Sequence, residues 1–383
     1  MIKDMNEELL LQYNKVTNNT KISICNGCAI YKNNARVFDG NVIRDILSFV
    51  STLHSKYRNI NIPISFELGS IIFKDKLTYI FLESICFLLI EYYNHNVYVK
   101  FLAEPNIFTN GINSSPLLLL TTNEKKHREK FICKYTFDIY KDHYRRLLSS
   151  EDMKNEKLSI IMDEIVFFLN HFEVDDQYLD DICEVIIELI GNVSEHTNAN
   201  CLIDIDIADS YNKRNEPGRF YGINLNIVNF SECLFGDLIR ERILYDDISE
   251  FSRYQLVRNA YDYHKGYFSE SYTENDFFNI VAFQHKISGN TAKVSTGGTG
   301  LTKLICSLEK CSDSHNCYLI SGDRALWFFH ELLEYNRDNW IGFNQEKDFI
   351  THLPEMKTVG SNTIFMPGTA FNLNFVMKRR ESN

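Results

Sequence analysis

The stretch Glu188-Leu-Ile-Gly-Asn192-Val-Ser-Glu195-His196-Thr197 decides how the second half of this chain is interpreted. It continues an apolar helical run, Ile182 to Ile190, and then carries polar groups where such a helix would normally stay apolar. Glu188, Asn192 and Glu195 are four and three residues apart, so they share one face of the predicted helix. A carboxylate one turn before a carboxamide is suited to holding a hydrated cation and activating a water molecule. The simpler alternative for Glu188 is a solvated helix residue.

Composition narrows the class of protein. The chain has 383 residues, 44% of them hydrophobic and 24% charged, which predicts a globular protein with room for two domains. A formal charge of −11 and a pI of about 5.5 argue against a nonspecific nucleic-acid binder, although such an average can hide a local basic patch. The longest apolar run, Ile80 to Ile90, contains Glu83 and is too short to span a bilayer, so no membrane partner is expected.

Ten cysteines are scattered along a chain whose first residues are polar and acidic. We therefore expect reduced thiols and a cytoplasmic protein. The motif Cys25-Asn-Gly-Cys28 allows a metal or redox site, but a zinc site needs a second ligand pair at matching spacing, and none is evident. The favoured interpretation is that both cysteines are thiols that lie in a turn or in the core.

The first 140 residues predict a small α/β domain. Apolar periodicity indicates a helix over Val42 to Tyr57, a strand over Asn61 to Leu68, a helix over Phe73 to Tyr93 and a strand over Asn96 to Leu102. Strand, helix and strand in this order predict a βαβ unit. A turn-rich and then charged stretch follows, so we place the domain boundary near 130–150 and the second domain at 150–383.

The second domain begins with helices predicted over Leu158 to Phe172 and Tyr178 to His196. Two alternating strands follow, Cys201 to Ala208 and Gly222 to Asn229, and then a helix over Leu234 to Leu244. Residues 245–295 are polar, aromatic and weakly periodic, which predicts a long mobile segment.

A glycine cluster, Ser295-Thr-Gly297-Gly298-Thr-Gly300-Leu301, precedes a helix predicted over Thr302 to Leu308. Backbone N–H groups in such a turn, with a helix N-terminus behind them, are suited to binding phosphate. The cluster is neither a P-loop nor a dinucleotide-binding fingerprint, because the Gly-Lys-Ser/Thr ending and a closely preceding first strand are both missing. The rest is predicted as a short strand at 317–321, a helix at 325–335 and two final strands at 362–366 and 370–377, joined by Pro367-Gly368-Thr369.

The order of these motifs resembles the GHKL ATP-binding superfamily, which groups DNA gyrase, large heat-shock chaperones, MutL-type repair proteins and histidine kinases. Glu188-Leu-Ile-Gly-Asn192 is similar to the N-box of that family, Gly297 to Leu301 to its glycine box, and Pro367 to Leu373 to its last adenine-pocket strand. The resemblance covers roughly residues 150–377. It implies an α+β fold, in which a two-layer sandwich with a mixed sheet, covered by helices on one face, follows the smaller α/β domain. It also implies an ATP lid around 245–300.

The resemblance assigns a role to each motif. Asn192 would coordinate Mg²⁺, and Glu188 would act as the general base for the attacking water or hydroxyl. The glycine box would bind the phosphates of ATP, and Thr369 would support adenine, while Lys293 and Lys303 both remain candidates for a phosphate contact. The residues of the glycine box are Gly297, Gly298, Thr299 and Gly300.

One position departs from the family pattern. The family has Asp-x-Gly-x-Gly after the middle strand, whereas this chain has Asn229-Phe-Ser-Glu232-Cys-Leu-Phe-Gly236. Asn229 is the positional match, and its carbonyl oxygen can accept a hydrogen bond from the adenine amine without supplying a charge. The adenine end of the pocket is therefore expected to be built differently.

In its order of elements, the first domain resembles the STAS-like domains of bacterial anti-sigma-antagonist proteins; an unclassified α/β interaction domain is the alternative. Together the resemblances imply an ATP-binding, Mg²⁺-dependent bacterial regulator that hydrolyses ATP or phosphorylates a protein partner slowly. The partner would bind through the first domain, and relatives that dimerise suggest a homodimer. The competing hypothesis is a nucleotide-sensing or protein-interaction module that kept the fold without turnover.

Overall fold

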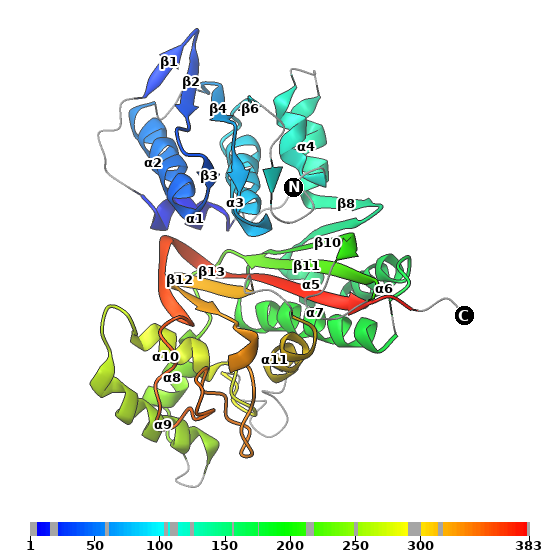
Figure 1. Cartoon of the computed structure of the whole chain (residues 1–383). Helices are drawn as coiled ribbons and strands as arrows, with labels where there is room; N and C mark the ends of the chain where they lie inside the picture. Colours follow the sequence, from blue (N-terminus) through cyan, green and yellow to red (C-terminus); the bar gives the residue numbers. More distant parts are fainter. Residues whose placement is uncertain are drawn as a thin grey trace.

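The computed structural model shows an α+β protein with a six-stranded, a four-stranded and a short three-stranded sheet among its described residues, and helices pack against the two larger sheets (Figure 1). It describes residues 6–15, 22–57, 61–102, 106–107, 114–122, 126–154, 157–174, 176–211, 218–248, 252–289, 300–312 and 317–380. The α+β fold class expected from the sequence is confirmed.

The N-terminal domain is built on a four-stranded sheet of order β1-β2-β4-β6. The β1–β2 hairpin is antiparallel, and β2, β4 and β6 run parallel to one another, so the predicted βαβ unit is confirmed. Short strands β3, β5 and β7 form a second parallel sheet. The bounds are α1 Glu8–Tyr13, β1 Ser23–Cys25, β2 Cys28–Lys32, β3 Val37–Phe38, α2 Gly40–Lys56, β4 Ile64–Gly69, β5 Ile72–Phe73, α3 Lys76–Phe87, β6 Val97–Phe101, β7 Asn106–Ile107 and α4 His127–Thr136.

Aspartate caps fix where the two main helices of this domain begin. Asp39 accepts hydrogen bonds from the backbone N–H groups of Asn41 and Val42 at the start of α2. Asp75 accepts from the N–H of Thr78 at 2.9 Å and so starts α3. Every residue of α3 is buried, because the helix lies between its own sheet and the sheet of the second domain.

The second domain is built on a six-stranded sheet of order β12-β13-β11-β10-β9-β8. Helix α4 passes directly into β8, so the sheet begins at Phe137, inside the 1–140 segment assigned from sequence to the first domain. The strands are β8 Phe137–Tyr140, β9 His143–Leu148, β10 Cys201–Tyr211, β11 Phe220–Asn229, β12 Tyr318–Trp327 and β13 Val359–Lys378. The helices are α5 Ser150–Lys154, α6 Lys157–Leu169, α7 Asp176–His196, α8 Asp237–Tyr245, α9 Arg253–His264, α10 Glu274–Val281 and α11 Gly300–Cys311.

Both faces of this sheet are covered, which corrects two expectations. All described pairings in it are antiparallel, so it is not a mixed sheet. One face packs against α6, α7 and α11, and the opposite face packs against α1, α2 and α3 of the first domain. The two domains therefore share a hydrophobic core instead of meeting through a linker.

Residues 245–295 were expected to form a long, weakly periodic and mobile segment, whereas residues 252–289 within it form regular helices. They form α9 and α10, and α10 starts with a capping box between Thr273 and Asp276. Asp276 also forms a buried ion pair with Arg324 of β12, at 2.6 Å. The segment is thus tied to the edge of the sheet by both apolar packing and a buried charge pair.

Two further predictions fail at the end of the chain. Residues 325–335 are not a helix: β12 continues to Trp327, and only a short 3-10 turn follows, His330–Leu332. The two final strands are one continuous strand, β13, which passes through Pro367 and Gly368. Gly368 has a φ of +87°, and a Cβ there would lie 2.4 Å from the carbonyl oxygen of Asn229, so this position requires glycine.

Candidate functional site

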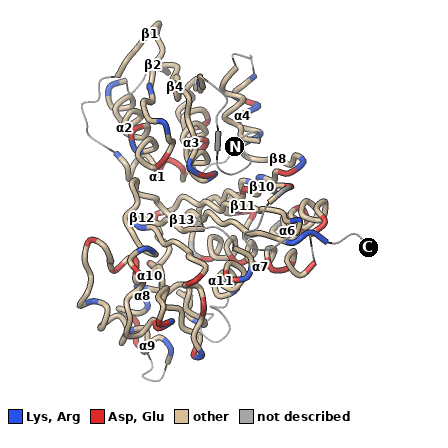
Figure 2. The backbone as a smooth tube through the Cα atoms, in the orientation of Figure 1, with Lys and Arg blue, Asp and Glu red and all other residues tan. Residues whose placement is uncertain are grey.

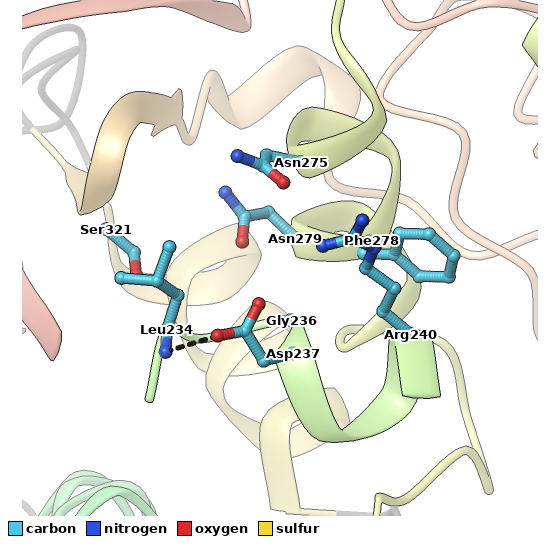
Figure 3. A pocket seen from close by; sticks show the side chains of 8 residues that line it. All are labelled: Leu234, Gly236, Asp237, Arg240, Asn275, Phe278, Asn279 and Ser321. Atoms are coloured by element: carbon cyan, nitrogen blue, oxygen red, sulfur yellow. Dashed lines mark hydrogen bonds between the residues drawn. The ribbon is translucent and has the colours of Figure 1, made fainter. Parts of the chain in front are cut away.

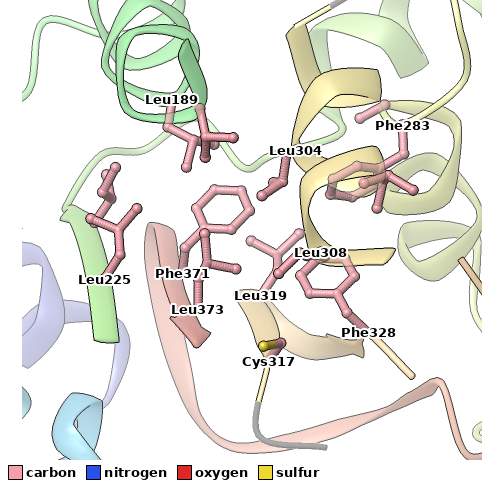
Figure 4. Packing of buried hydrophobic residues seen from close by; sticks show 14 of the residues in the cluster. Leu189, Leu225, Phe283, Leu304, Leu308, Cys317, Leu319, Phe328, Phe371 and Leu373 are labelled. Carbon is pink, nitrogen blue, oxygen red and sulfur yellow. The ribbon is translucent and has the colours of Figure 1, made fainter. Parts of the chain in front are cut away.

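Helix α7 presents Glu188 and Asn192 beside its sheet-facing side. Val185, Leu189 and Val193 are buried against the sheet, whereas Glu188 and Asn192 are half-buried. Figure 4 shows Leu189 facing the aromatic ring of Phe371 and the leucines around it. The apolar stripe thus fixes the helix, and the two predicted site residues lie at the margin of the core.

Strands β11 and β13 bring Asn229 and Thr369 together. The two residues are direct cross-strand partners, and both are buried. Because side chains alternate along a strand, Asn229 lies on the same face as Ile227, and Thr369 on the same face as Phe371. Ile227 and Phe371 belong to the core beneath α7, so both predicted adenine contacts lie on the α7 side of the sheet.

The predicted elements meet at one end of the sheet. Helix α7 ends at His196, β10 starts at Cys201, and Cys201 pairs with Asn229. Ion pairs of 2.8 Å join Lys303 to Glu184 and Lys310 to Asp181, which shows that α11 runs antiparallel to α7. The start of α11 therefore points along α7 from Glu184 toward the Glu188 and Asn192 end of that helix.

The described part of the glycine box is limited to Gly300, the first residue of α11. Gly297, Gly298, Thr299 and Lys293 lie outside the described residues. Lys303 is paired with Glu184, so its ammonium is engaged on the surface of α7.

The segment that follows Asn229, where the sequence resemblance predicts the adenine contact, is not glycine-rich in this chain. The side-chain amide of Asn229 donates to the hydroxyl of Ser231 at 3.5 Å, and that hydroxyl donates to the carbonyl oxygen of Cys233 at 2.8 Å. Phe235 then packs against Phe283 and Phe371, with ring centroids 5.4 and 5.7 Å away. An aromatic cluster follows Asn229 where the family has its glycines.

A small polar pocket lies between α8 and α10 (Figure 3). Asp237 lines this pocket, and its carboxylate accepts a hydrogen bond from the backbone N–H of Leu234 at 2.8 Å. Ser321 links it to the site described above, since its hydroxyl donates to the carbonyl oxygen of Gly368 at 2.6 Å. The lining residues are Leu234, Gly236, Asp237, Arg240, Asn275, Phe278, Asn279 and Ser321.

The sequence interpretation missed a second polar assembly, on the opposite face of the sheet. Strand register aligns polar side chains in two rows across four strands, and α3 covers these rows. The inner row is Arg145, Asp204, Asn226 and Asn372, and the outer row is His143, Asp206, Asn224 and Asn374. The alternating Ile-Asp-Ile-Asp-Ile of β10 was the available signal, but it was used only to predict a strand.

Charges from both domains meet at these rows. The ammonium of Lys76, on α3, contacts the carboxylates of Asp204 and Asp206, and all three side chains are buried. Arg145 donates to Asp204 and, at 2.7 Å, to Glu83 of α3. His143 joins Asp204 at 3.2 Å. This network fixes the orientation of α3 on the sheet.

The network shifts the pKa values of its members. Although burial alone would raise the pKa of Asp204, the Arg145, Lys76 and His143 side chains beside it hold that pKa well below its usual range. Burial lowers the pKa of Lys76 to about 8, against the attraction of Asp204. Burial raises the pKa of Glu83, and Arg145 opposes that shift.

The only cluster of three potential metal ligands among the described residues belongs to this network. Ligand atoms of His143, Asp204 and Asp206 lie within 4.8 Å of one another. The Lys76 ammonium occupies the position between the two carboxylates that a cation would take. The cluster therefore does not fit the Mg²⁺ expected beside Asn192, which lies on the other face of the sheet.

Lys and Arg are interspersed with Asp and Glu in both domains, and basic residues do not gather over one element in this view (Figure 2). Within the described ranges, no helix combines the length and the apolarity needed to cross a membrane. Comparison with known proteins finds no matching family model, curated protein or solved structure.

Proposed function

We propose that the chain binds ATP with Mg²⁺ at the end of the six-stranded sheet, between the last turns of α7 and the start of α11. The observation that supports the proposal is that Glu188, Asn192, Asn229, Thr369 and Gly300 belong to elements that pack together on the α7 face of the sheet. These residues come from four elements far apart in sequence, and each had been singled out for the same ligand.

The residues have separate roles in this proposal. The side-chain oxygen of Asn192 would bind Mg²⁺, an ion that prefers oxygen ligands and keeps several waters. Glu188, one turn earlier and half-buried, would orient the attacking water or hydroxyl. The N-terminus of α11 offers backbone N–H groups and a favourable potential for phosphate. Bound ATP with Mg²⁺ would supply the phosphoryl group.

We further propose that the protein is a GHKL-type bacterial regulator whose nucleotide state is read through its first domain. The first domain and the sheet share one core, so a shift in β11 or β13 would reach α1, α2 and α3 by direct contact. Its hairpin-plus-parallel strand order is compatible with the STAS-like resemblance. The substrate of slow phosphotransfer would then be a protein partner.

A second candidate function is nucleotide sensing without turnover. The buried Asn229 and the aromatic cluster behind it favour this alternative, because they replace the charged, glycine-rich end found in the family. Binding would then act only on the shape of the sheet and on the domain attached to it.

ATP binding and turnover should be measured for wild type, Glu188→Ala and Asn192→Ala, with Asp180→Ala as the matched control on the exposed side of α7. We expect Asn192→Ala to lose Mg²⁺-dependent affinity at least tenfold, and Glu188→Ala to bind ATP but lose turnover. The control should match wild type. If wild type binds no ATP at millimolar Mg·ATP, the nucleotide proposal fails. Binding without turnover in wild type would leave the sensing function in its place.

A further inference from the structure

The β1–β2 hairpin carries a pair of thiols that the proposed function does not use. Cys25 and Cys28 are direct cross-strand partners on either side of a two-residue turn, Asn26-Gly27. Asn26 has a φ of +50° and Gly27 a φ of +76°, as a tight hairpin turn with two left-handed residues requires. Directly opposed residues project on the same face of a hairpin, so the two thiols lie side by side.

The position of the pair leaves it accessible. Cys25 is exposed and Cys28 is partly exposed, and both are free thiols. The hairpin projects from the end of the N-terminal domain that points away from the six-stranded sheet (Figure 1). All of β1 is exposed, including Ile24 with 41% of its surface accessible, and β1 forms an edge of its sheet.

Charged side chains lie on the same face of the sheet as the two thiols. The ammonium groups of Lys32 and Lys100 share the carboxylate of Glu67, so these three side chains together carry one positive charge. Burial raises the pKa of the Cys28 thiol, Glu67 and Cys25 add to that rise, and Lys100 opposes it without reversing it, so a thiolate here depends on a bound metal ion. A bound Zn²⁺ deprotonates its thiol ligands outright and prefers four of them in a tetrahedral set.

We propose that this hairpin tip is half of a structural zinc site, completed by the same hairpin of a second copy of the chain. Each copy supplies Cys25 and Cys28, so one Zn²⁺ is bound by four thiolates and four protons are released to solvent. Among the described residues, no third Cys, His, Asp or Glu groups with this pair, so one chain alone leaves the tetrahedral set incomplete. Meeting at projecting tips brings the two exposed β1 edges together, and the lysines of both copies offset the −2 charge of a zinc tetrathiolate.

The test uses the full chain, reduced and freed of metal. Added ZnCl₂ should double the mass measured by sedimentation velocity, with a stoichiometry of one zinc per two chains. Co²⁺ in place of Zn²⁺ should give the thiolate-to-metal charge-transfer absorption of a tetrahedral four-thiolate site. This absorption is expected whether the metal-free protein is a monomer or already a dimer. Cys25→Ser and Cys28→Ser should each abolish the mass change and the spectrum, whereas Cys133→Ser, at another exposed cysteine, should keep both.

Three results would overturn the proposal. One zinc per chain without a change in mass would mean that the site is complete within a single copy. A dimer that persists in Cys25→Ser and Cys28→Ser would assign the interface to another surface. A Cys25–Cys28 disulfide that forms with peroxide while no Co²⁺ spectrum appears in the reduced protein would identify a redox pair instead of a metal site.

Discussion

The two faces of the six-stranded sheet are stabilised in opposite ways. The face toward α7 and α11 is apolar, with leucine, isoleucine and phenylalanine side chains packed as Figure 4 shows. The face toward α3 combines an apolar row, in which Leu202 and Val228 lie, with the two polar rows centred on Asp204 and Asp206. The same central strands therefore contribute to a hydrophobic core on one face and to a buried charge network on the other.

This difference indicates which face tolerates change. An apolar core loses contacts gradually when a side chain is shortened, because the neighbours partly relax. A buried charge that loses its partner has no such route, since water cannot reach it. The polar face is thus expected to fix the position of α3, and the apolar face to supply most of the burial energy.

The largest expected effect follows from removing the carboxylate at the centre of the polar face. Asp204→Ala leaves Lys76 and Arg145 without their shared partner and should lower the free energy of unfolding by about 3–5 kcal/mol, measured by urea denaturation. The matched control is Glu67→Ala, which removes the half-buried partner of the exposed Lys100 and should cost about 1 kcal/mol or less. Equal costs for the two variants would show that the network contributes nothing beyond a surface pair.

The apolar face should respond next. Leu189→Ala removes a fully buried side chain between α7 and the sheet and should cost about 3 kcal/mol in the same assay. Ile187→Ala, on the exposed side of the same helix, should stay within about 0.5 kcal/mol of wild type. A small effect for Leu189→Ala would mean that the helix can repack, and the contrast between the faces would weaken.

Acidic pH should change the stability contributed by the polar face but not that contributed by the apolar face. The pKa of Asp204 is held well below its usual value near 3.8, so its stabilising contribution is complete above that pH and is lost as the pH falls through the lowered pKa. Relative to Asp204→Asn, wild type should lose up to about 1.4 kcal/mol of stability per pH unit below about pH 4. The cost of Leu189→Ala should not change over that range, since no proton is exchanged there. A pH-independent difference between wild type and Asp204→Asn would contradict the lowered pKa.

The smallest effect is expected outside both faces. Lys303→Ala removes a half-exposed ion pair with Glu184 and should cost about 0–1 kcal/mol, less at high salt. The same variant tests whether Lys303 contacts a phosphate, because ATP affinity would then fall while stability stays nearly unchanged. A loss of stability similar to that of Asp204→Ala would mean that Lys303 belongs to the buried charge network. That result would contradict its half-exposed position.

Much of the element order could be predicted from local pattern. The helices at α2, α6, α7 and α11, and the strands β10 and β11, have clear periods of 3.6 or 2 residues, and they are confirmed. The helix predicted at residues 325–335 was wrong because the run from Ala325 to Phe329 is continuously apolar. Periodicity cannot distinguish a buried strand from a buried helix in so short a run. Pro367-Gly368 suggested a turn, but β12 pairs Ile320 with Ala370 and Gly322 with Met366, so the pair lies in a bulge of a continuing strand.

The residues of the candidate site were named from the sequence and stay a prediction, whereas the structure around them was not foreseen. Glu188, Asn192, Asn229 and Thr369 were singled out from sequence, and the convergence of their elements follows from strand register and helix direction. The aromatic cluster at Phe235 and the pocket at Asp237 were not predicted, because they depend on how α10 packs against α8 and β12.

By itself, the sequence determined that β10 is a strand with aspartates on one side and isoleucines on the other. A period of two residues fixes this alternation whatever lies nearby. Only the tertiary structure decided that the aspartate side is buried: α3, from a segment more than a hundred residues earlier, lies across it and places Lys76 between Asp204 and Asp206. Alternation reports that two faces differ, and burial depends on which distant segment covers each one.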